Sequence, residues 1–186
     1  MNVPNKITVF RFCLIPVFTV AFLLEGAFPD SKQIIDYIAL FFFAVASVSD
    51  FFDGYLARKN HEVTDFGKLM DPLADKMLVC TALICFVQLR DNFPCWCAAV
   101  VVAREFIISG FRQLAAEKKN IIMASYWAKA KTAVSMVMCI LYILDLQYSW
   151  FKLSETIFMW AATALTVISL VDYLIKNWDV MRQASK

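Results

Sequence analysis

The chain of 186 residues is 61% hydrophobic and only 18% charged, and its formal net charge at pH 7 is +2. A soluble domain has roughly 45 to 50% apolar and about 25% charged residues. This composition therefore excludes an ordinary soluble domain and favours an integral membrane protein without a nucleic-acid partner.

Six apolar stretches are long enough to cross a bilayer, since a spanning helix needs about 20 apolar residues. They cover residues 8–28, 34–57, 70–89, 94–114, 126–147 and 153–175. We expect an all-α integral membrane protein with six transmembrane helices, forming a single domain over residues 1–186. The first stretch has no small-residue cleavage site, so we expect it to remain as the first helix and not to be a cleaved signal.

The distribution of lysine and arginine predicts the orientation, because these residues gather in cytoplasmic loops. With six spans both termini share one side. Of the 18 lysines and arginines, only Lys32, Arg90 and Lys152 lie on the other side. We therefore expect a protein of the cytoplasmic (inner) cell membrane, with both termini and the 58–68 loop in the cytoplasm and Arg90 in an external loop.

The cysteines and the histidine point away from a thiolate or imidazole metal site. The six cysteines mostly lie inside apolar stretches and show no C-x-x-C spacing, which favours free thiols over a disulfide or zinc framework. His61 is the single histidine, and we expect it in a solvated loop.

Four aspartates stand at helical spacing on either side of this loop. Asp50 and Asp53 are i, i+3 neighbours, and Asp71 and Asp75 are i, i+4 neighbours, so each pair shares one face of a helix. Oxygen ligands alone suit hard cations such as Mg²⁺, Mn²⁺ or Ca²⁺. Two facing pairs of acids are able to bridge two ions about 4 Å apart, the separation used in phosphoryl transfer.

Small residues and one arginine stand beside these acids. Gly54, Ala57 and Gly67 leave room for a ligand to reach the backbone, and Arg58 is able to hold a phosphate through two hydrogen bonds. The pattern predicts a site for a phosphorylated ligand that opens to the cytoplasm.

A second group of charges lies in the fourth and fifth apolar stretches. Charges deep in a membrane face a bundle interior or a water-filled cavity, so we interpret Arg104, Arg112, Lys129 and Lys131 as a cationic pocket, with snorkelling to lipid phosphates as the alternative. Arg104 and Glu105 either pair structurally or, because adjacent helical residues point about 100° apart, each has another partner. In the last stretch we expect no intramembrane charge before Asp172.

The residues from Asp50 to Asp75 form the pattern D-x-x-D-G-x-x-A-R, then eight residues, then G-x-x-x-D-x-x-x-D. This pattern resembles, position for position, the signature of the CDP-alcohol phosphotransferases. The resemblance implies a homodimer of six-helix subunits, each with a short amphipathic N-terminal segment. It also implies that a hydroxyl of an acceptor attacks the β-phosphorus of a CDP-linked lipid and releases CMP.

The resemblance assigns roles to the residues of the signature. It implies that two Mg²⁺ or Mn²⁺ ions are held by all four aspartates, with Asp75 also acting as the general base for the acceptor hydroxyl. The residues that it places around the cytidine diphosphate are Gly54, Ala57, Arg58 and Gly67.

Three further runs resemble the bacterial phosphatidylglycerophosphate synthase subgroup of that family. They are N-x-P-N-x-x-T-x-x-R at residues 2–11, A-R-E-F-I-I-S-G-F-R at 103–112 and A-K-A-K-T at 128–132. The subgroup implies CDP-diacylglycerol and sn-glycerol 3-phosphate as substrates, with Asn5 and Thr8 near the nucleotide. The acceptor phosphate would then be bound by the cationic pocket of Arg104, Arg112, Lys129 and Lys131.

Other functions stay open at this point. Another acceptor, such as inositol phosphate or phosphatidylglycerol, would fit the same signature. An intramembrane prenyltransferase also uses acidic helices and Mg²⁺, but it needs more helices and two separated acidic motifs. A divalent-cation transporter would use intramembrane acids as its ion path, but would leave Gly54, Ala57, Arg58 and the basic residues unexplained.

Overall fold

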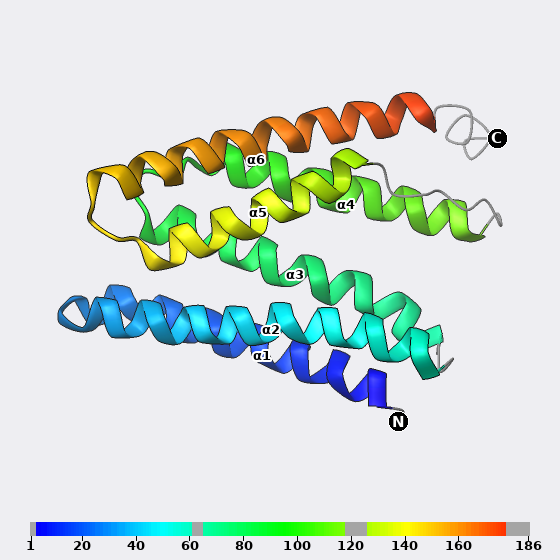
Figure 1. Ribbon diagram of the computed structural model, residues 1–186, viewed down its shortest axis with the longest axis horizontal. Coiled ribbons are helices and arrows are strands. Elements are labelled where there is room, and N and C mark those ends of the chain that lie inside the picture. Colours follow the sequence, from blue (N-terminus) through cyan, green and yellow to red (C-terminus); the bar gives the residue numbers. More distant parts are fainter. Residues whose placement is uncertain (1–2, 61–64, 118–125, 178–186) are drawn as a thin grey trace. The chain divides into compact units, whose positions relative to one another are not determined.

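The computed structural model describes the backbone of residues 3–60, 65–117 and 126–177, and the side chains of residues 8–49, 73–74, 76–113 and 126–177. Figure 1 shows that most of these residues are helical, and no strand occurs among them. The helices are α1 (Val3–Ala27), the short 3₁₀ turn η1 (Pro29–Ser31), α2 (Lys32–Asn60), α3 (Asp65–Leu89), α4 (Cys95–Glu117), α5 (Tyr126–Leu144) and α6 (Ser149–Lys176). The all-α prediction is confirmed. The N-terminal segment is continuous with α1 from Val3 onward.

The described helices have the length and composition of membrane spans in four cases, which are Thr8–Ala27, Pro29–Ser49, Tyr126–Leu144 and Ser149–Lys176. The described part of α3 contributes a shorter apolar stretch, Lys76–Leu89. Helix α4 is continuous, but Arg104, Glu105 and Arg112 interrupt its apolar sequence. These helices support the prediction of an integral membrane protein, and the crossing of the bilayer by α3 and α4 stays a prediction.

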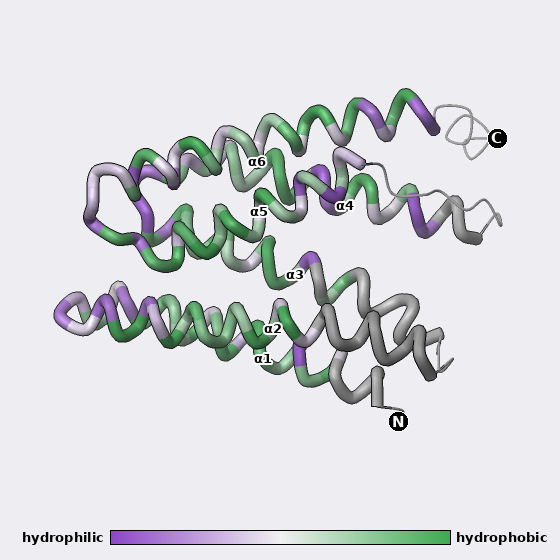
Figure 2. The backbone as a smooth tube through the Cα atoms, viewed as in Figure 1, coloured by the Kyte–Doolittle hydropathy of each residue, from purple (hydrophilic) through white to green (hydrophobic). Residues whose placement is uncertain are grey.

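The apolar character extends to the outside of the helices. Figure 2 shows hydrophobic residues along most of the described length of α1, α2 and α6. Large apolar side chains such as Phe41, Ile84 and Ile175 are more than 60% exposed. Water would disfavour such a surface, whereas lipid tails match it.

The chain divides into two compact units. The first contains residues 1–91 with 139–146, and the second contains residues 92–138 with 147–186. Helix α5 therefore contributes its last turns to the first unit and the rest to the second.

A row of aromatic rings fills the core of the first unit. Phe18 and Phe22, one turn apart on α1, stack with ring centres 5.7 Å apart. Phe18 also packs on Phe43 of α2 at 5.8 Å, and Phe22 meets the edge of Phe86 of α3 at 5.9 Å. Phe86 in turn packs on Tyr142 of α5 at 5.4 Å. Because aromatic rings bury large areas in preferred geometries, this row joins α1, α2, α3 and the end of α5.

Small residues bring helices together in the second unit. Helix α6 buries Ala162, Thr163, Thr166 and Ser169 along one face, and α4 packs against α6. Small residues allow close approach of membrane helices, so this face of α6 is suited to packing against α4. Thr163 and Thr166 donate their hydroxyls to carbonyls one turn earlier, which satisfies them inside the helix.

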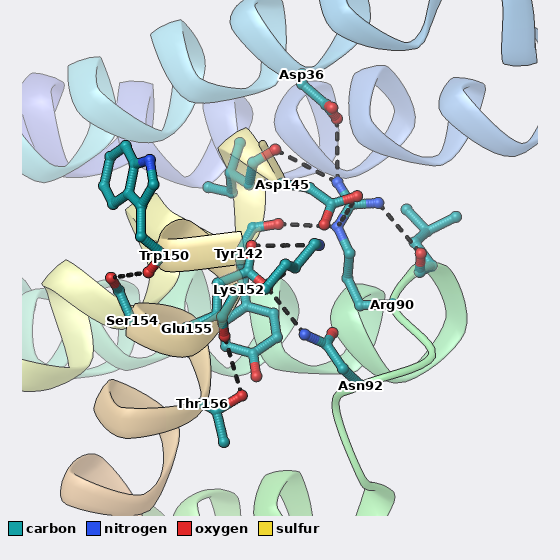
Figure 3. A network of polar contacts seen from close by, with 12 residues as sticks. Asp36, Arg90, Asn92, Tyr142, Asp145, Trp150, Lys152, Ser154, Glu155 and Thr156 are labelled. Carbon is teal, nitrogen blue, oxygen red and sulfur yellow. Dashed lines mark hydrogen bonds and ion pairs between the residues drawn. The ribbon is translucent and has the colours of Figure 1, made fainter. Parts of the chain in front are cut away.

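The expectation that the last apolar stretch has no charge before Asp172 is wrong. Helix α6 begins at Ser149, earlier than predicted, and Glu155 within it is fully buried. Its carboxylate accepts a hydrogen bond from Asn92 at 2.9 Å and lies 3.3 Å from the amine of Lys152 (Figure 3). A buried charge requires such partners; Lys152 lies one turn earlier on the same helix, and Asn92 comes from a distant part of the chain.

The cysteines behave as predicted, because all six are free thiols. His61 lies outside the described residues.

Candidate functional site

The signature aspartates lie on helical backbone on both sides of residues 61–64. Asp50 and Asp53 belong to α2, and Asp71 and Asp75 belong to α3. The i, i+3 and i, i+4 spacings therefore apply to real helices, as the sequence predicted. The side chains of these four residues lie outside the described set, so metal binding by them stays a prediction. Among the side chains that are described, no three acidic, histidine or cysteine residues form a metal cluster.

The predicted nucleotide-binding residues are distributed over three helices. Gly54, Ala57 and Arg58 lie on α2 and Gly67 on α3, with side-chain positions outside the described residues. Asn5 lies on α1, and its side chain is also outside the described residues.

Thr8 is the one predicted nucleotide-binding residue whose side chain is described. It lies on α1 and is 1% exposed, as is Arg11 one turn later. Helix α1 therefore buries a polar face near its N-terminal end. Nucleotide binding by Asn5 and Thr8 stays a prediction.

The four predicted cations of α4 and α5 divide into two kinds. Arg104 and Lys131 are buried, at 6% and 4% exposed. Arg112 and Lys129 are exposed. Burial separates a pair held inside the second unit from a pair available to solvent or lipid headgroups.

The buried cations meet at one carboxylate oxygen. Nη1 of Arg104 donates to Oε1 of Glu105 at 2.8 Å, and Nζ of Lys131 donates to the same oxygen. Nη2 of Arg104 donates to the hydroxyl of Ser169 on α6. Glu105 thus joins α4 to α5, and Arg104 joins α4 to α6. Both expectations for Arg104 and Glu105 hold, since they pair with each other and each also has a second partner.

Several polar atoms of this unit are buried without a hydrogen-bond partner among the described residues. They are Nε of Arg104, the hydroxyls of Ser135 and Tyr173, and the carboxylate oxygen Oδ2 of Asp172. Ser135 lies one turn after Lys131 on α5, and Tyr173 lies one turn after Ser169 on α6. Buried polar groups normally have partners, so unused donors beside two cations suit a bound anion. We call Arg104, Glu105, Lys131 and Ser169 the Glu105 cluster.

A second buried cluster, which the sequence analysis missed, surrounds Arg90 in the first unit. Arg90 was expected in an external loop, but it is only 3% exposed. Its Nη1 donates to both oxygens of Glu25 at 2.6 and 2.7 Å. Its Nη2 donates to Asp36 at 3.1 Å (Figure 3). Asp145 lies 3.7 Å from Nε of Arg90 and also forms an ion pair with Lys32. Lys32 is 3.0 Å from Glu25.

Arg90 also caps the C-terminal end of α5. Its Nε donates to the carbonyl of Tyr142 at 2.9 Å and its Nη2 to that of Ile143 at 3.3 Å, two of the carbonyls that a helix end leaves unpaired. The chain leaves α5 at Asp145, whose φ of 41° is in the left-handed region that aspartate tolerates. The guanidinium carbon lies 5.1 Å from the ring centre of Phe22.

These contacts stabilise the charge of Arg90. Burial alone would lower the pKa of its guanidinium, but the hydrogen bonds to Glu25 and the nearby Asp145 and Asp36 carboxylates raise that pKa above its usual value. We call Glu25, Lys32, Asp36, Arg90 and Asp145 the Arg90 cluster. The signal for it in the sequence was the presence of Glu25 and Asp36 within apolar stretches.

Comparisons with known proteins identify the family of this chain. The family model described as CDP-alcohol phosphatidyltransferase matches residues 1–168. A Bacillus subtilis protein named CDP-diacylglycerol–glycerol-3-phosphate 3-phosphatidyltransferase is 36% identical, over 99% of both chains. Proteins of the same name from Rickettsia bellii, 36% identical over 92% of this chain and 93% of the relative, and from Haemophilus influenzae, 35% identical over 93% and 91%, are similar too. The chain belongs to the CDP-alcohol phosphatidyltransferase family.

Proposed function

We propose that this protein transfers the phosphatidyl group of CDP-diacylglycerol to sn-glycerol 3-phosphate, giving phosphatidylglycerophosphate and CMP. The observation that supports this most strongly is the similarity, over 99% of the chain, to a relative named for that activity. The signature from Asp50 to Asp75 supplies the residue types that the chemistry needs.

The metal-binding residues are proposed to be Asp50, Asp53, Asp71 and Asp75. Their donor set is made of carboxylate oxygens only, which fits Mg²⁺ or Mn²⁺. Two such ions, when bound, would supply positive charge that offsets the four acids and the charge of the departing phosphate.

The reaction itself is proposed to depend on Asp75. Its carboxylate takes the proton of the acceptor hydroxyl, and that oxygen forms a bond to the β-phosphorus of CDP-diacylglycerol. The bond from this phosphorus to the bridging oxygen breaks, and CMP leaves with the electron pair. Arg58 holds the phosphates through its guanidinium. Gly54, Ala57 and Gly67 leave space for the nucleotide against the helix backbone.

Binding of the nucleotide is proposed to extend to Asn5 and Thr8 on α1. The burial of Thr8 beside the start of the first span supports an internal polar role for it and not contact with solvent.

The acceptor phosphate is proposed to bind at Arg104 and Lys131, with Arg112 and Lys129 nearer the cytoplasmic side. The burial of both cations, and the Nε of Arg104 that has no hydrogen-bond partner, support this assignment. A dianionic phosphate needs fixed positive charge, because only such charge offsets the loss of its hydration.

The membrane arrangement is proposed to be a homodimer of subunits with six spans each. Both termini and the active site would face the cytoplasm, and the protein would lie in the cytoplasmic (inner) membrane. The excess of lysine and arginine on one side supports the orientation.

An acceptor screen tests the function. Purified protein is given CDP-diacylglycerol, Mg²⁺ or Mn²⁺ and one acceptor at a time: glycerol 3-phosphate, inositol phosphate or phosphatidylglycerol. We expect CMP release with glycerol 3-phosphate alone, and none after chelation of the metal. Release with another acceptor only would replace the proposed substrate, and metal binding without any CMP release would favour a transporter.

Replacing the general base tests the mechanism. We expect Asp75→Asn to keep its fold and its metal but to lower kcat by about 10²- to 10⁴-fold, because a general base contributes that much to rate. The matched control is Asp91→Asn, which alters an exposed aspartate between α3 and α4 and should leave kcat unchanged. Full activity of Asp75→Asn would remove the base assignment.

A further inference from the structure

Glu105 stands between two positive side chains that would otherwise repel each other. Arg104 and Lys131 both donate to its Oε1, and all three side chains are more than nine-tenths buried. Like charges buried close together are unfavourable, and a carboxylate between them offsets that repulsion. Glu105 is therefore the reason that both cations occupy one place.

The carboxylate leaves much of the donor capacity of the two cations unused. A lysine has three N–H donors and an arginine five. The contacts within the cluster go to Glu105 and Ser169 only, and Nε of Arg104 is buried without a hydrogen-bond partner. A purely structural ion pair would be expected to use its buried donors. Unused donors point to a ligand with several acceptor oxygens.

We propose that Glu105 is a positioning residue, which holds Arg104 and Lys131 together so that their remaining N–H groups bind the phosphate of the acceptor. This inference rests on the proposed function, in which those two cations bind the acceptor. Glu105 itself does not touch the phosphate, because two anions would repel.

The charge of the cluster fits this role. Arg104 and Lys131 with one carboxylate have a net charge of +1, whereas the two cations alone would have +2. A site with a net charge of +1 attracts a dianion. When the acceptor is absent, burying a charge of +1 in a low-dielectric interior costs less free energy than burying a charge of +2. The geometry, with one oxygen shared by both cations, keeps the two cations ordered before the acceptor arrives, which lowers the entropy lost on binding.

Kinetics of Glu105 variants test the proposal. We expect Glu105→Gln to raise the KM for glycerol 3-phosphate on the order of tenfold, since hydrogen bonds to charged groups are stronger than neutral ones. The KM for CDP-diacylglycerol should not change. Glu105→Asp keeps the negative charge and should restore part of the acceptor KM. It also keeps the test available where Glu105→Gln lowers the yield of folded protein.

Glu155→Gln is the matched control, because it also removes a fully buried, hydrogen-bonded carboxylate of the second unit. We expect it to lower thermal stability without changing the acceptor KM. If Glu105→Gln only lowered stability in the same way, Glu105 would be structural and the proposal wrong. A lower acceptor KM in Glu105→Gln would also overturn it, since Glu105 would then compete with the acceptor for the cations.

A binding measurement separates this proposal from the proposed function. Calorimetry with inorganic phosphate, without CDP-diacylglycerol, should show weaker binding to Glu105→Gln than to the unaltered protein and to Glu155→Gln. If the unaltered protein released no CMP with glycerol 3-phosphate, the proposed function would fail, and the phosphate titration would still decide the role of Glu105. Equal phosphate binding by all three proteins would refute the positioning role alone.

Discussion

The two buried clusters differ in how many guanidinium nitrogens of their arginine have hydrogen-bond partners. In the Arg90 cluster, Nε, Nη1 and Nη2 of Arg90 all donate to carboxylates or carbonyls, and a ring lies against the guanidinium. In the Glu105 cluster, Arg104 leaves Nε without a partner. Every guanidinium nitrogen of Arg90 therefore has a protein partner, whereas Arg104 retains an unused donor.

The make-up of the two clusters differs as well. The Arg90 cluster contains the carboxyl groups of Glu25, Asp36 and Asp145 with Lys32 and Arg90, so acidic groups outnumber basic ones. The Glu105 cluster has an excess of positive charge. Burial alone therefore does not identify a binding site. Unused donors and an unbalanced positive charge are what distinguish a site for an anion from a structural clamp.

The largest effect on stability is expected from Arg90→Met. The substitution keeps most of the volume but leaves three buried carboxylates with Lys32 as their remaining cation, and loss of one partner of a buried ion pair costs about 3–5 kcal/mol. Chemical unfolding of the protein in detergent, followed by circular dichroism, measures this. Among molecules that remain folded, the acceptor KM should not change.

Arg112→Met is the control for that substitution, because Arg112 is exposed. It should leave the unfolding midpoint nearly unchanged. Equal stability of Arg90→Met and the unaltered protein would show that the Arg90 cluster does not hold the first unit together.

An intermediate effect is expected from Arg104→Met, and on binding more than on stability. Glu105 keeps Lys131 as a partner, so no buried charge is left alone. The acceptor KM should rise about ten- to a hundredfold, the equivalent of a lost charged hydrogen bond. Steady-state kinetics with both substrates measure it, and the KM for CDP-diacylglycerol serves as the internal control. A loss of stability as large as in Arg90→Met, with an unchanged acceptor KM, would make both clusters structural.

The smallest effect is expected from Arg112→Ala. Its guanidinium is exposed, at the end of the A-R-E-F-I-I-S-G-F-R run, and is screened by solvent, so the acceptor KM should rise only about two- to fivefold. This rise should shrink at high salt, unlike the rise in Arg104→Met, because salt screens exposed charges most. If Arg112→Ala left the acceptor KM unchanged and weakened nucleotide binding, the division into two binding regions would be wrong.

The sequence by itself determined the class of this protein and the helical spacing of its signature. Apolar stretches predict helices in a membrane because their length and composition are local properties. The spacing of Asp50, Asp53, Asp71 and Asp75 is likewise a local property, and it survives on the helices α2 and α3. The same holds for the family, which the comparisons confirm.

Only the tertiary structure decided which charges are buried and what they bind. Arg90 binds Glu25, which is 65 residues away in the sequence, and Asp36, which is 54 residues away. The α5 carbonyls that it caps are 52 and 53 residues away. Likewise, Lys131 donates to Glu105, which lies 26 residues earlier in the chain. Arg112 and Lys129 are exposed. Helical periodicity specifies the face on which a charge lies. It does not specify which other face packs against it, and that packing determines whether the charge becomes a clamp or a binding site.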